Sequence, residues 1–171
     1  MPLSDEPLWR PNAERIAAAN LTAFRAAVKR QWNTETADFA ALYDWSIAEP
    51  ERFWQSVWSF GGVIAETQGA VALEDRHRMP GARFFPGARL NFAENLLRRR
   101  DDADALVFWG EDKVKRRLSF RERHNQVSRL AQALRAMGIK PGDRIAGFVP
   151  NMPETIVATL ATASIGAIWS S

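Results

Sequence analysis

The sequence contains no cysteine, and this absence removes several kinds of chemistry at once. With no Cys among 171 residues, these residues can form no disulfide, no thiolate zinc site and no cysteine nucleophile. Histidine is almost as scarce, because His77 and His124 are the only two. Glu74 and Asp75 stand close to His77, but one imidazole beside two adjacent carboxylates is a poor metal-ligand set. A solvated loop is therefore the favoured interpretation of this segment.

Glycine-rich phosphate loops are missing as well. The patterns G-x-G-x-x-G, G-x-x-x-x-G-K-[S/T] and G-x-S-x-G do not occur in the sequence. Gly61-Gly62 comes nearest, yet it is expected to end a helix rather than to open one. Phosphate is held by the free amides of a helix N-terminus, which a C-terminus does not offer. These residues are therefore expected to contain no nucleotide cradle.

Long apolar runs and massed positive charge are also absent. The longest apolar stretch, residues 156–169, is shorter than the roughly 20 residues that a membrane-spanning helix needs. The net charge is +3, but the arginines are scattered rather than gathered on one element. Residues 1–7 lack the basic and then apolar order of a signal peptide. We therefore expect a cytoplasmic protein with no membrane partner and no nucleic-acid partner.

Aromatic residues at helical spacing mark the first third of the chain. The sequence has 7 Trp and 10 Phe, and such rings supply much of the buried area of a core. Apolar residues three and four positions apart predict helices over residues 13–30, after Asp38 and after Pro50. Asn12 and Asp38 can each cap a first turn through a side-chain oxygen. We expect the aromatic face to pack as core, and a ring-stacking recognition surface is the alternative.

The middle of the chain has short strands and then concentrates its charge. Strands are predicted at residues 70–73 and 83–85, and Asn91 with Glu94 forms a capping-box pattern at the start of a helix. Arg98-Arg-Arg100 is expected to end that helix. Two interpretations of these arginines stay open: a phosphate-binding patch, or cations at a helix C-terminus. Three aspartates follow closely and would repel a polyanion, which favours the second.

The pattern of the last seventy residues predicts a hairpin followed by a βαβ unit. The expected elements are strands over residues 105–109 and 114–119, a helix from the Ser119 capping box to Gly138, a strand over 144–149, a helix over 154–165 and a strand over 167–170. Parallel strands joined by a crossover helix are normally covered on both faces. We therefore expect an α/β fold that is incomplete at Ser171, with a domain boundary near residues 98–104. Exposed apolar surface and an unpaired strand edge are expected to favour aggregation.

With these patterns in place, the chain resembles the adenylate-forming acyl-CoA synthetase superfamily, and within it the acetoacetyl-CoA synthetases (acetoacetate–CoA ligases). The segments that carry the resemblance are PLWRP (7–11), FPGARLNFAENLL (85–97), LVFWGED (106–112), PGDRIAGFVPNMPE (141–154) and ASIGAIWSS (163–171). They cover essentially the whole chain in register. The closing IGAIWSS favours the acetoacetate branch over the acetate branch. Phe84 is one departure, since tryptophan is expected before Phe85-Pro-Gly.

The resemblance implies a helical N-terminal cap over residues 1–100 and the beginning of an AMP-binding, adenylate-forming domain over residues 101–171. Such enzymes activate a carboxylate with ATP and Mg²⁺ to an acyl-adenylate and then pass the acyl group to the thiol of CoA. The family's phosphate loop and catalytic lysine correspond to positions beyond Ser171. No catalytic, cofactor-binding or metal-ligating residue is therefore assigned. Trp169, Ser170 and Ser171 are assigned to the wall of the substrate pocket, on its acyl or CoA side.

The chain is thus expected to be the N-terminal portion of an acetoacetate–CoA ligase, inactive by itself and binding no ATP, Mg²⁺ or CoA. The small-molecule partners of the intact enzyme would be acetoacetate, ATP and CoA. Two alternatives stay open. One is a stand-alone interaction or regulatory module derived from an acyl-CoA synthetase, and the other is a fragment of an acetate- or propionate-type enzyme. No oligomeric state is predicted.

Overall fold

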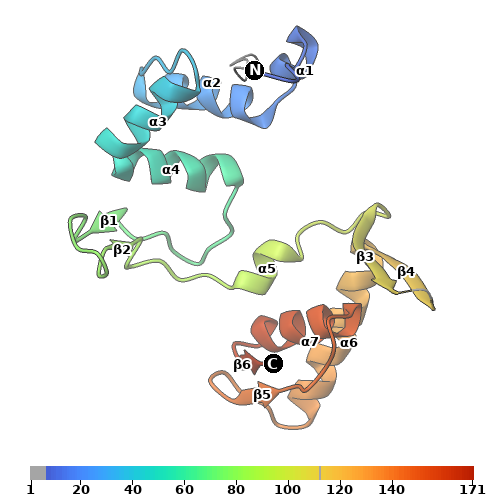
Figure 1. Cartoon of the computed structure of the whole chain (residues 1–171). Coiled ribbons are helices and arrows are strands. Elements are labelled where there is room, and N and C mark those ends of the chain that lie inside the picture. The colour runs from blue at the N-terminus through green and yellow to red at the C-terminus, as the bar shows by residue number, and fades with distance from the viewer. Residues whose placement is uncertain (1–6, 112) are drawn as a thin grey trace. The chain divides into compact units, whose positions relative to one another are not determined.

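The contacts of the chain divide it into two compact units. Figure 1 labels the helices and strands of both and colours them by residue number. The computed structural model describes residues 7–111 and 113–171. Unit 1 comprises Met1–Val63, described from residue 7, and Gln68–Ala88. Unit 2 comprises Ile64–Thr67 and Arg89–Ser171, described apart from residue 112.

Some sequence expectations fall outside this description. Most of the acidic leader, residues 1–6, and Asp112 of the predicted hairpin turn lie outside the described residues. The predicted domain boundary near residues 98–104 stays a prediction. The two compact units are defined by contacts within the chain, and such units need not coincide with domains.

Four helices open the described part of unit 1. Their bounds are α1 Ala13–Ala17, α2 Asn20–Trp32, α3 Phe39–Ala48 and α4 Pro50–Gly61. Both predicted caps are confirmed: Asn12 Oδ1 accepts a hydrogen bond from the Arg15 amide at 2.8 Å, and Asp38 Oδ1 accepts one from the Ala41 amide at 2.8 Å. Each cap satisfies an amide that the first turn cannot pair internally. Gly62 ends α4 in the left-handed conformation, at φ 59°.

The continuous helix predicted over residues 13–30 is wrong, because the chain breaks between α1 and α2. Ala19 is extended, with φ −71° and ψ 139°. The hydroxyl of Thr22 donates to the carbonyl oxygen of Ile16 at 2.6 Å across the break. Such a side-chain bond gives the backbone an alternative to the helical pattern. Three consecutive alanines favour helix, so local propensity predicted the wrong result here.

An aromatic core joins α2, α3 and α4. Its buried members are Phe24, Val28, Leu42 and Trp45. The rings of Phe24 and Phe53 meet edge to face, with centroids 6.0 Å apart and planes at 86°, an arrangement that aromatic pairs favour. The predicted core packing is confirmed for these residues. It is wrong for Phe39 and Tyr43, which stack on each other and remain exposed.

Two short strands complete unit 1. They are β1 Leu73–Glu74 and β2 Arg83–Phe84, and they pair in antiparallel fashion. The rings of Trp54 and Phe84 lie 5.4 Å apart, and those of Trp58 and Phe85 lie 4.7 Å apart, so aromatic contacts join this segment to α4. β2 lies within the strand predicted over residues 83–85, whereas β1 shares only Leu73 with the strand predicted over residues 70–73.

Unit 2 contains a hairpin that leads directly into a long helix. The hairpin strands are β3 Asp104–Gly110 and β4 Val114–Ser119, followed by α6 Phe120–Ala136. Ser119 Oγ accepts from the Glu122 amide at 3.1 Å, and Glu122 Oε2 accepts from the Ser119 amide at 2.8 Å. The predicted capping box is confirmed, and it fixes the junction of hairpin and helix.

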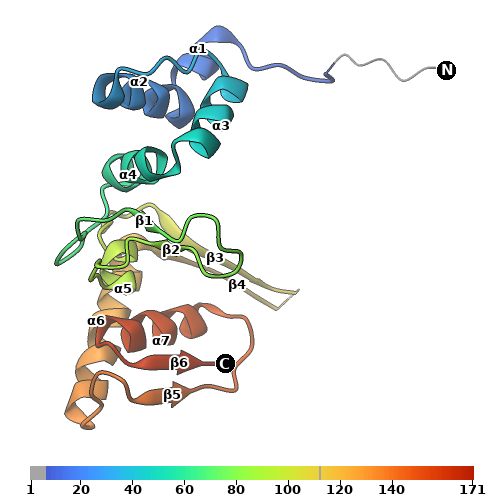
Figure 2. The same ribbon diagram turned by 90° about the vertical axis from the view of Figure 1, so that its left-hand side faces the viewer.

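The predicted βαβ unit is also confirmed. It consists of β5 Arg144–Ala146, α7 Pro153–Ser164 and β6 Ile168–Ser170. The strands pair in parallel, and Figure 2 shows both arrows running the same way with α7 beside them. The strand predicted over residues 144–149 is shorter than expected, because the chain leaves the sheet after Ala146. In the described part of the chain, no helix has the length and apolarity that crossing a membrane takes.

The core of unit 2 lies where α6 and α7 pack together. Its buried residues include Val127 and Ala131 on α6 and Leu160 and Ala161 on α7. Ala93, on the short helix α5 Phe92–Leu96, is completely buried in the same cluster. Small side chains at Ala93 and Ala161 leave room for helices to approach closely.

Asn91 joins α5 to α7 with one side chain. Its Oδ1 accepts from the Glu94 amide at 3.2 Å, which confirms the predicted cap. Its Nδ2 donates to the carbonyl oxygen of Ala163 at 2.9 Å, near the end of α7. Side-chain amides can serve both roles because they carry an acceptor and a donor.

Substituting Asn91 separates these two roles. Asn91→Asp keeps the N-cap acceptor but replaces the donor with a carboxylate that faces a carbonyl oxygen, so we expect unit 2 to lose about 1–2 kcal/mol of stability. Asn12→Asp is the matched control, since Asn12 is a cap whose acceptor makes the bond to Arg15, and its effect should stay within about 0.5 kcal/mol. The stability of both variants is measured by urea unfolding that is monitored through hydrogen exchange. Equal effects of the two substitutions would show that the bond to α7 contributes nothing.

The arginine cluster lies just beyond α5, which ends at Leu96 rather than within the cluster as predicted. Arg99 pairs with Asp101 at 2.5 Å and Arg121 pairs with Asp102 at 2.7 Å. A hydrogen bond from Arg99 holds the pKa of the Asp101 carboxyl below its usual value. The expected placement of the cluster in the last turn of a helix is wrong, because no basic residue lies in the last turn of α5. The pair of Arg99 with Asp101 shows that one of the three arginines is neutralised locally.

Candidate functional site

The predicted pocket residues lie at the carboxyl ends of β5 and β6. Trp169 is paired with Ile145, and Ser170 with Ala146. Neighbouring residues of a strand point to opposite faces of the sheet. Trp169 is therefore on the face of Ile145, which packs against the α6–α7 core, and Ser170 is on the opposite face. Their assignment to a pocket wall stays a prediction.

Gly147 is a neighbour of Trp169 that the sequence analysis did not single out. Its amide donates to the carbonyl oxygen of Ser170 at 2.9 Å, which extends the strand pairing by one bond. A Cβ atom at position 147 would lie 2.6 Å from Cη2 of Trp169. A glycine inside a predicted strand often marks a close approach of another group, and this signal could have identified it.

An ion pair holds the hairpin against the start of α7. Arg116 Nη2 donates to Glu154 Oε1 at 2.6 Å. This hydrogen bond is the main cause of a lowered pKa for the Glu154 carboxyl. Glu154 lies in the first turn of α7, where negative charge also favours the helix dipole. The pair therefore positions the helix that follows the end of β5.

The lowered pKa gives this ion pair a defined pH dependence. The stabilisation is fully present above the unfolded-state pKa of glutamate and is lost as pH falls through the lower folded-state value. Because both side chains are partly exposed, we expect less than about 1 kcal/mol. Glu154→Gln should make unit 2 stability less dependent on pH between about pH 5 and pH 3. Urea midpoints at several pH values measure this, and Arg116→Gln should give the same flattening; an unchanged slope in either variant contradicts the prediction.

Arg123 is a buried cation that sequence reasoning missed. It is 8% exposed, and burial lowers the pKa of its guanidinium. Its Nη2 donates to the carbonyl oxygen of Leu96 at 2.6 Å, and its guanidinium carbon lies 4.9 Å from the Phe120 ring centroid. A cation at the last carbonyl groups of a helix stabilises that helix end. These contacts assign Arg123 a structural role at the end of α5.

An apolar groove runs over α2, α3 and α4 in unit 1. It has a volume of about 380 Å³ and includes the exposed rings of Phe39 and Tyr43. Phe24 and Phe53 form part of its lining and belong to the core. The groove is thus a surface opening of the aromatic core, and it contains no ionisable group suited to catalysis apart from the phenol of Tyr43.

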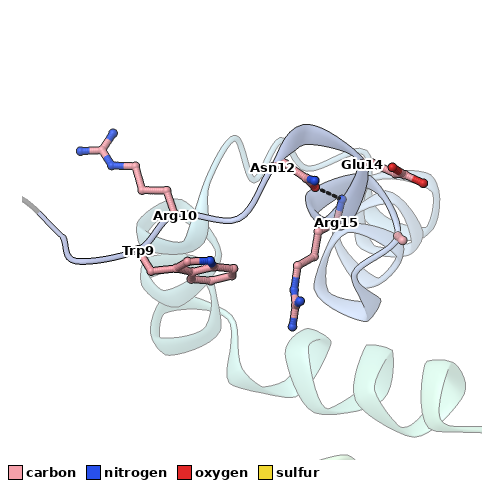
Figure 3. A pocket seen from close by; sticks show the side chains of 6 residues that line it. Trp9, Arg10, Asn12, Glu14 and Arg15 are labelled. Atoms are coloured by element: carbon pink, nitrogen blue, oxygen red, sulfur yellow. Dashed lines mark hydrogen bonds between the residues drawn. The ribbon is translucent and has the colours of Figure 1, made fainter.

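A second hollow lies beside α1, shown in Figure 3. The Arg15 guanidinium carbon is 5.3 Å from the Trp9 ring centroid, and the Arg10 side chain points away from the indole. Asn12 lines this hollow, and its side-chain oxygen already accepts the hydrogen bond that caps α1. The hollow therefore combines a cation–π contact with a helix cap, and neither needs a ligand.

The described residues bring together no set of side chains that fits a metal ion. Among residues 7–111 and 113–171, no three His, Cys, Asp or Glu side chains come together in a way that could hold a metal ion. Glu74 lies in β1 and pairs with Arg83, and Asp75 pairs with Arg78, so the loop predicted for this segment begins only after Glu74. A triphosphate needs backbone amides and cations directed at it, and the sequence contains none of the three glycine-rich phosphate-loop patterns. No reaction step is therefore assigned to ATP or Mg²⁺ here.

Comparisons with known proteins give consistent results. Residues 92–170 match the family model of the AMP-binding enzymes, and residues 39–96 match that of the acetyl-coenzyme A synthetase N-terminus. Acetoacetyl-coenzyme A synthetase of Rhizobium meliloti is 52% identical over 168 residues, which are 98% of this chain and 26% of the relative. Acetoacetyl-CoA synthetase of Xenopus tropicalis is 38% identical over 96% of this chain and 25% of the relative.

A solved structure agrees with the same pattern. Acetoacetyl-CoA synthetase from Streptomyces lividans matches 97% of this chain and 26% of its own length, with a TM-score of 0.84 and 42% identity. The chain thus spans about a quarter of the length of the relatives it matches. The matched 97% of the chain includes most of both units.

Proposed function

Because this chain belongs to the acyl-CoA synthetase family and corresponds to the N-terminal part of its relatives, we propose that it forms the N-terminal part of an acetoacetate–CoA ligase. The observation that carries the proposal is the 52% identity to an acetoacetyl-coenzyme A synthetase over 98% of the chain. The proposal includes a cytoplasmic location.

The proposed reaction of the intact enzyme joins acetoacetate to CoA at the expense of ATP. An acetoacetate oxygen would displace pyrophosphate from ATP, and the CoA sulfur would then displace AMP from the acyl carbon, with Mg²⁺ required. The described residues hold no metal-ligand cluster, and the sequence contains none of the three glycine-rich phosphate-loop patterns, so we propose that these steps take place on other parts of the intact enzyme. Acetoacetate, ATP, Mg²⁺ and CoA are partners of the intact enzyme in this proposal.

This chain would contribute mainly structure to the enzyme. It would contact the substrate only at the carboxyl ends of β5 and β6. β5 and β6 would supply two neighbouring parallel strands of the large domain, held on one side by α6 and α7. Ligands of open parallel sheets bind beyond the carboxyl ends of the strands. Trp169, Ser170 and Ser171 would therefore stand at the substrate pocket, on its acyl or CoA side. Residues 1–100 would form the cap and residues 101–171 the beginning of the AMP-binding domain.

The proposal is tested with the intact protein that carries these residues. AMP release is measured with acetoacetate, acetate or propionate as the acid, in the presence of ATP, Mg²⁺ and CoA. We expect acetoacetate to be the preferred acid. A preference for acetate or propionate would place the protein in the other branch. If none of the three acids supports AMP release, the result would favour an interaction or regulatory module and would end the proposal.

A further inference from the structure

The contact between Gly147 and Trp169 leaves no room for a side chain at position 147. A Cβ atom built at position 147 would lie 2.6 Å from Cη2 and 3.1 Å from Cζ2 of the indole. Real Cβ atoms do not approach other atoms to 2.6 Å. The six-membered ring of Trp169 therefore occupies the volume that any other residue at 147 would need.

Position 147 needs glycine because a side chain there has no room, and not because the backbone adopts a conformation that favours glycine. Gly138 and Gly142 have φ values of 86° and 88°, in the left-handed region that favours glycine. Gly147 does not belong to this group of positive-φ glycines. An alanine at 147 would therefore fit the backbone and clash only with the ring. Since the amide of Gly147 is held by the carbonyl of Ser170 at 2.9 Å, the ring is the part that must move.

This contact lies where a ligand of the sheet is expected. Gly147 directly follows β5, and Trp169 is the second-to-last residue of β6. Both residues therefore lie at the carboxyl ends of these two strands. The Trp169 side chain is only half-buried, so part of the indole is open to contact. A fixed aromatic surface of this kind suits a short apolar chain.

We infer that Gly147 is a positioning residue that fixes the Trp169 indole as an apolar wall at the carboxyl edge of the β5–β6 sheet. The ligand of this wall is the apolar part of a short chain, which the methyl and methylene groups of acetoacetate and the methylene groups of the thiol arm of CoA both offer. The inference rests on the proposed function for the identity of that ligand. The contact between the two residues stands independently of it.

The contact is tested in the 171-residue chain labelled with 5-fluorotryptophan. The chain has 7 Trp, and the fluorine resonance of Trp169 is the one that disappears in Trp169→Phe. Gly147→Ala should shift this resonance and leave the others in place. Gly61→Ala is the matched control, because a Cβ at Gly61 would meet nothing within 4 Å. A Trp169 resonance that stays in place in Gly147→Ala overturns the inference.

The double variant Gly147→Ala/Trp169→Phe guards against a folding defect. Phenylalanine lacks the outer ring atoms that meet the added methyl group, so the double variant should fold as well as Trp169→Phe alone. If Gly147→Ala unfolds and the double variant folds, the clash with the indole is demonstrated. If both unfold, the glycine serves something other than Trp169 and the inference is wrong.

The role in substrate binding is tested in the intact synthetase. Gly147→Ala should raise KM about tenfold with little change in kcat, since a displaced apolar wall removes binding that the ground state and transition state share. A rise in KM for acetoacetate identifies the acyl group as the ligand, and a rise in KM for CoA identifies the thiol arm. In the Trp169→Phe background, Gly147→Ala should have no further effect. Unchanged KM values in an active parent overturn this inference, whereas a parent without acetoacetate-dependent turnover overturns the proposed function instead.

Discussion

Phe24→Ala is expected to lower the free energy of unfolding of unit 1 by about 4 kcal/mol. Phe24 is 8% exposed, and its ring meets those of Phe53 and Phe60 edge to face at 6.0 and 5.3 Å. Truncation removes both ring contacts and leaves a cavity between α2 and α4. Since the chain has two units, the loss is measured by hydrogen exchange of the α2 amides rather than by a single global transition.

Phe39→Ala is the matched control for this substitution. Phe39 lies in the same unit and is 67% exposed, so its truncation should change the stability by no more than about 0.5 kcal/mol. If both phenylalanines give the same loss, the aromatic core of unit 1 is not where the structure places it.

Leu160→Ala is expected to destabilise unit 2 by about 3 kcal/mol. Leu160 is 3% exposed and belongs to the cluster that joins α7 to α6 through Val127 and Ala131. The loss should appear in the exchange rates of α6 and α7 amides, because their packing is the main apolar contact of the unit. Leu8→Ala, at a fully exposed leucine, should have almost no effect. A loss smaller than about 1 kcal/mol for Leu160→Ala would contradict the packing described here.

Local signals in the sequence predicted most of the elements correctly. The caps at Asn12, Asp38 and Ser119 act through hydrogen bonds within one turn, so a short stretch of sequence contains the whole interaction. The hairpin and the βαβ unit were predicted for the same reason, since apolar alternation and turn residues are local patterns. The break at Ala19 was not predicted, because its cause is a hydroxyl bond between Thr22 and Ile16 that competes with strong helix formers.

The site was harder to predict than the fold, because its contacts join distant residues. Asn91 meets Ala163, Arg123 meets Leu96, and Trp169 covers Gly147. No spacing rule predicts which buried carbonyl an arginine will reach or which glycine an indole will cover. The resemblance to the acyl-CoA synthetases is confirmed by relatives and by a solved structure. The role of Trp169, Ser170 and Ser171 remains a prediction.

We propose that this chain carries the family's structural features without carrying its reaction chemistry. The two units contain caps, cores and parallel strands that match acetoacetyl-CoA synthetases along almost all of the 171 residues. The described residues contain no metal-ligand cluster, and the sequence contains none of the three glycine-rich phosphate-loop patterns. We therefore expect them to support the fold and one edge of a pocket, without carrying out adenylation.

Acetoacetate-dependent exchange of pyrophosphate into ATP tests this claim most directly. The purified 171-residue chain and the intact synthetase are assayed side by side with Mg²⁺, and a mock purification controls for host enzymes. We predict exchange by the intact synthetase and none above the mock level by the 171-residue chain. Exchange by the chain alone would show that it holds a nucleotide site and would contradict the account.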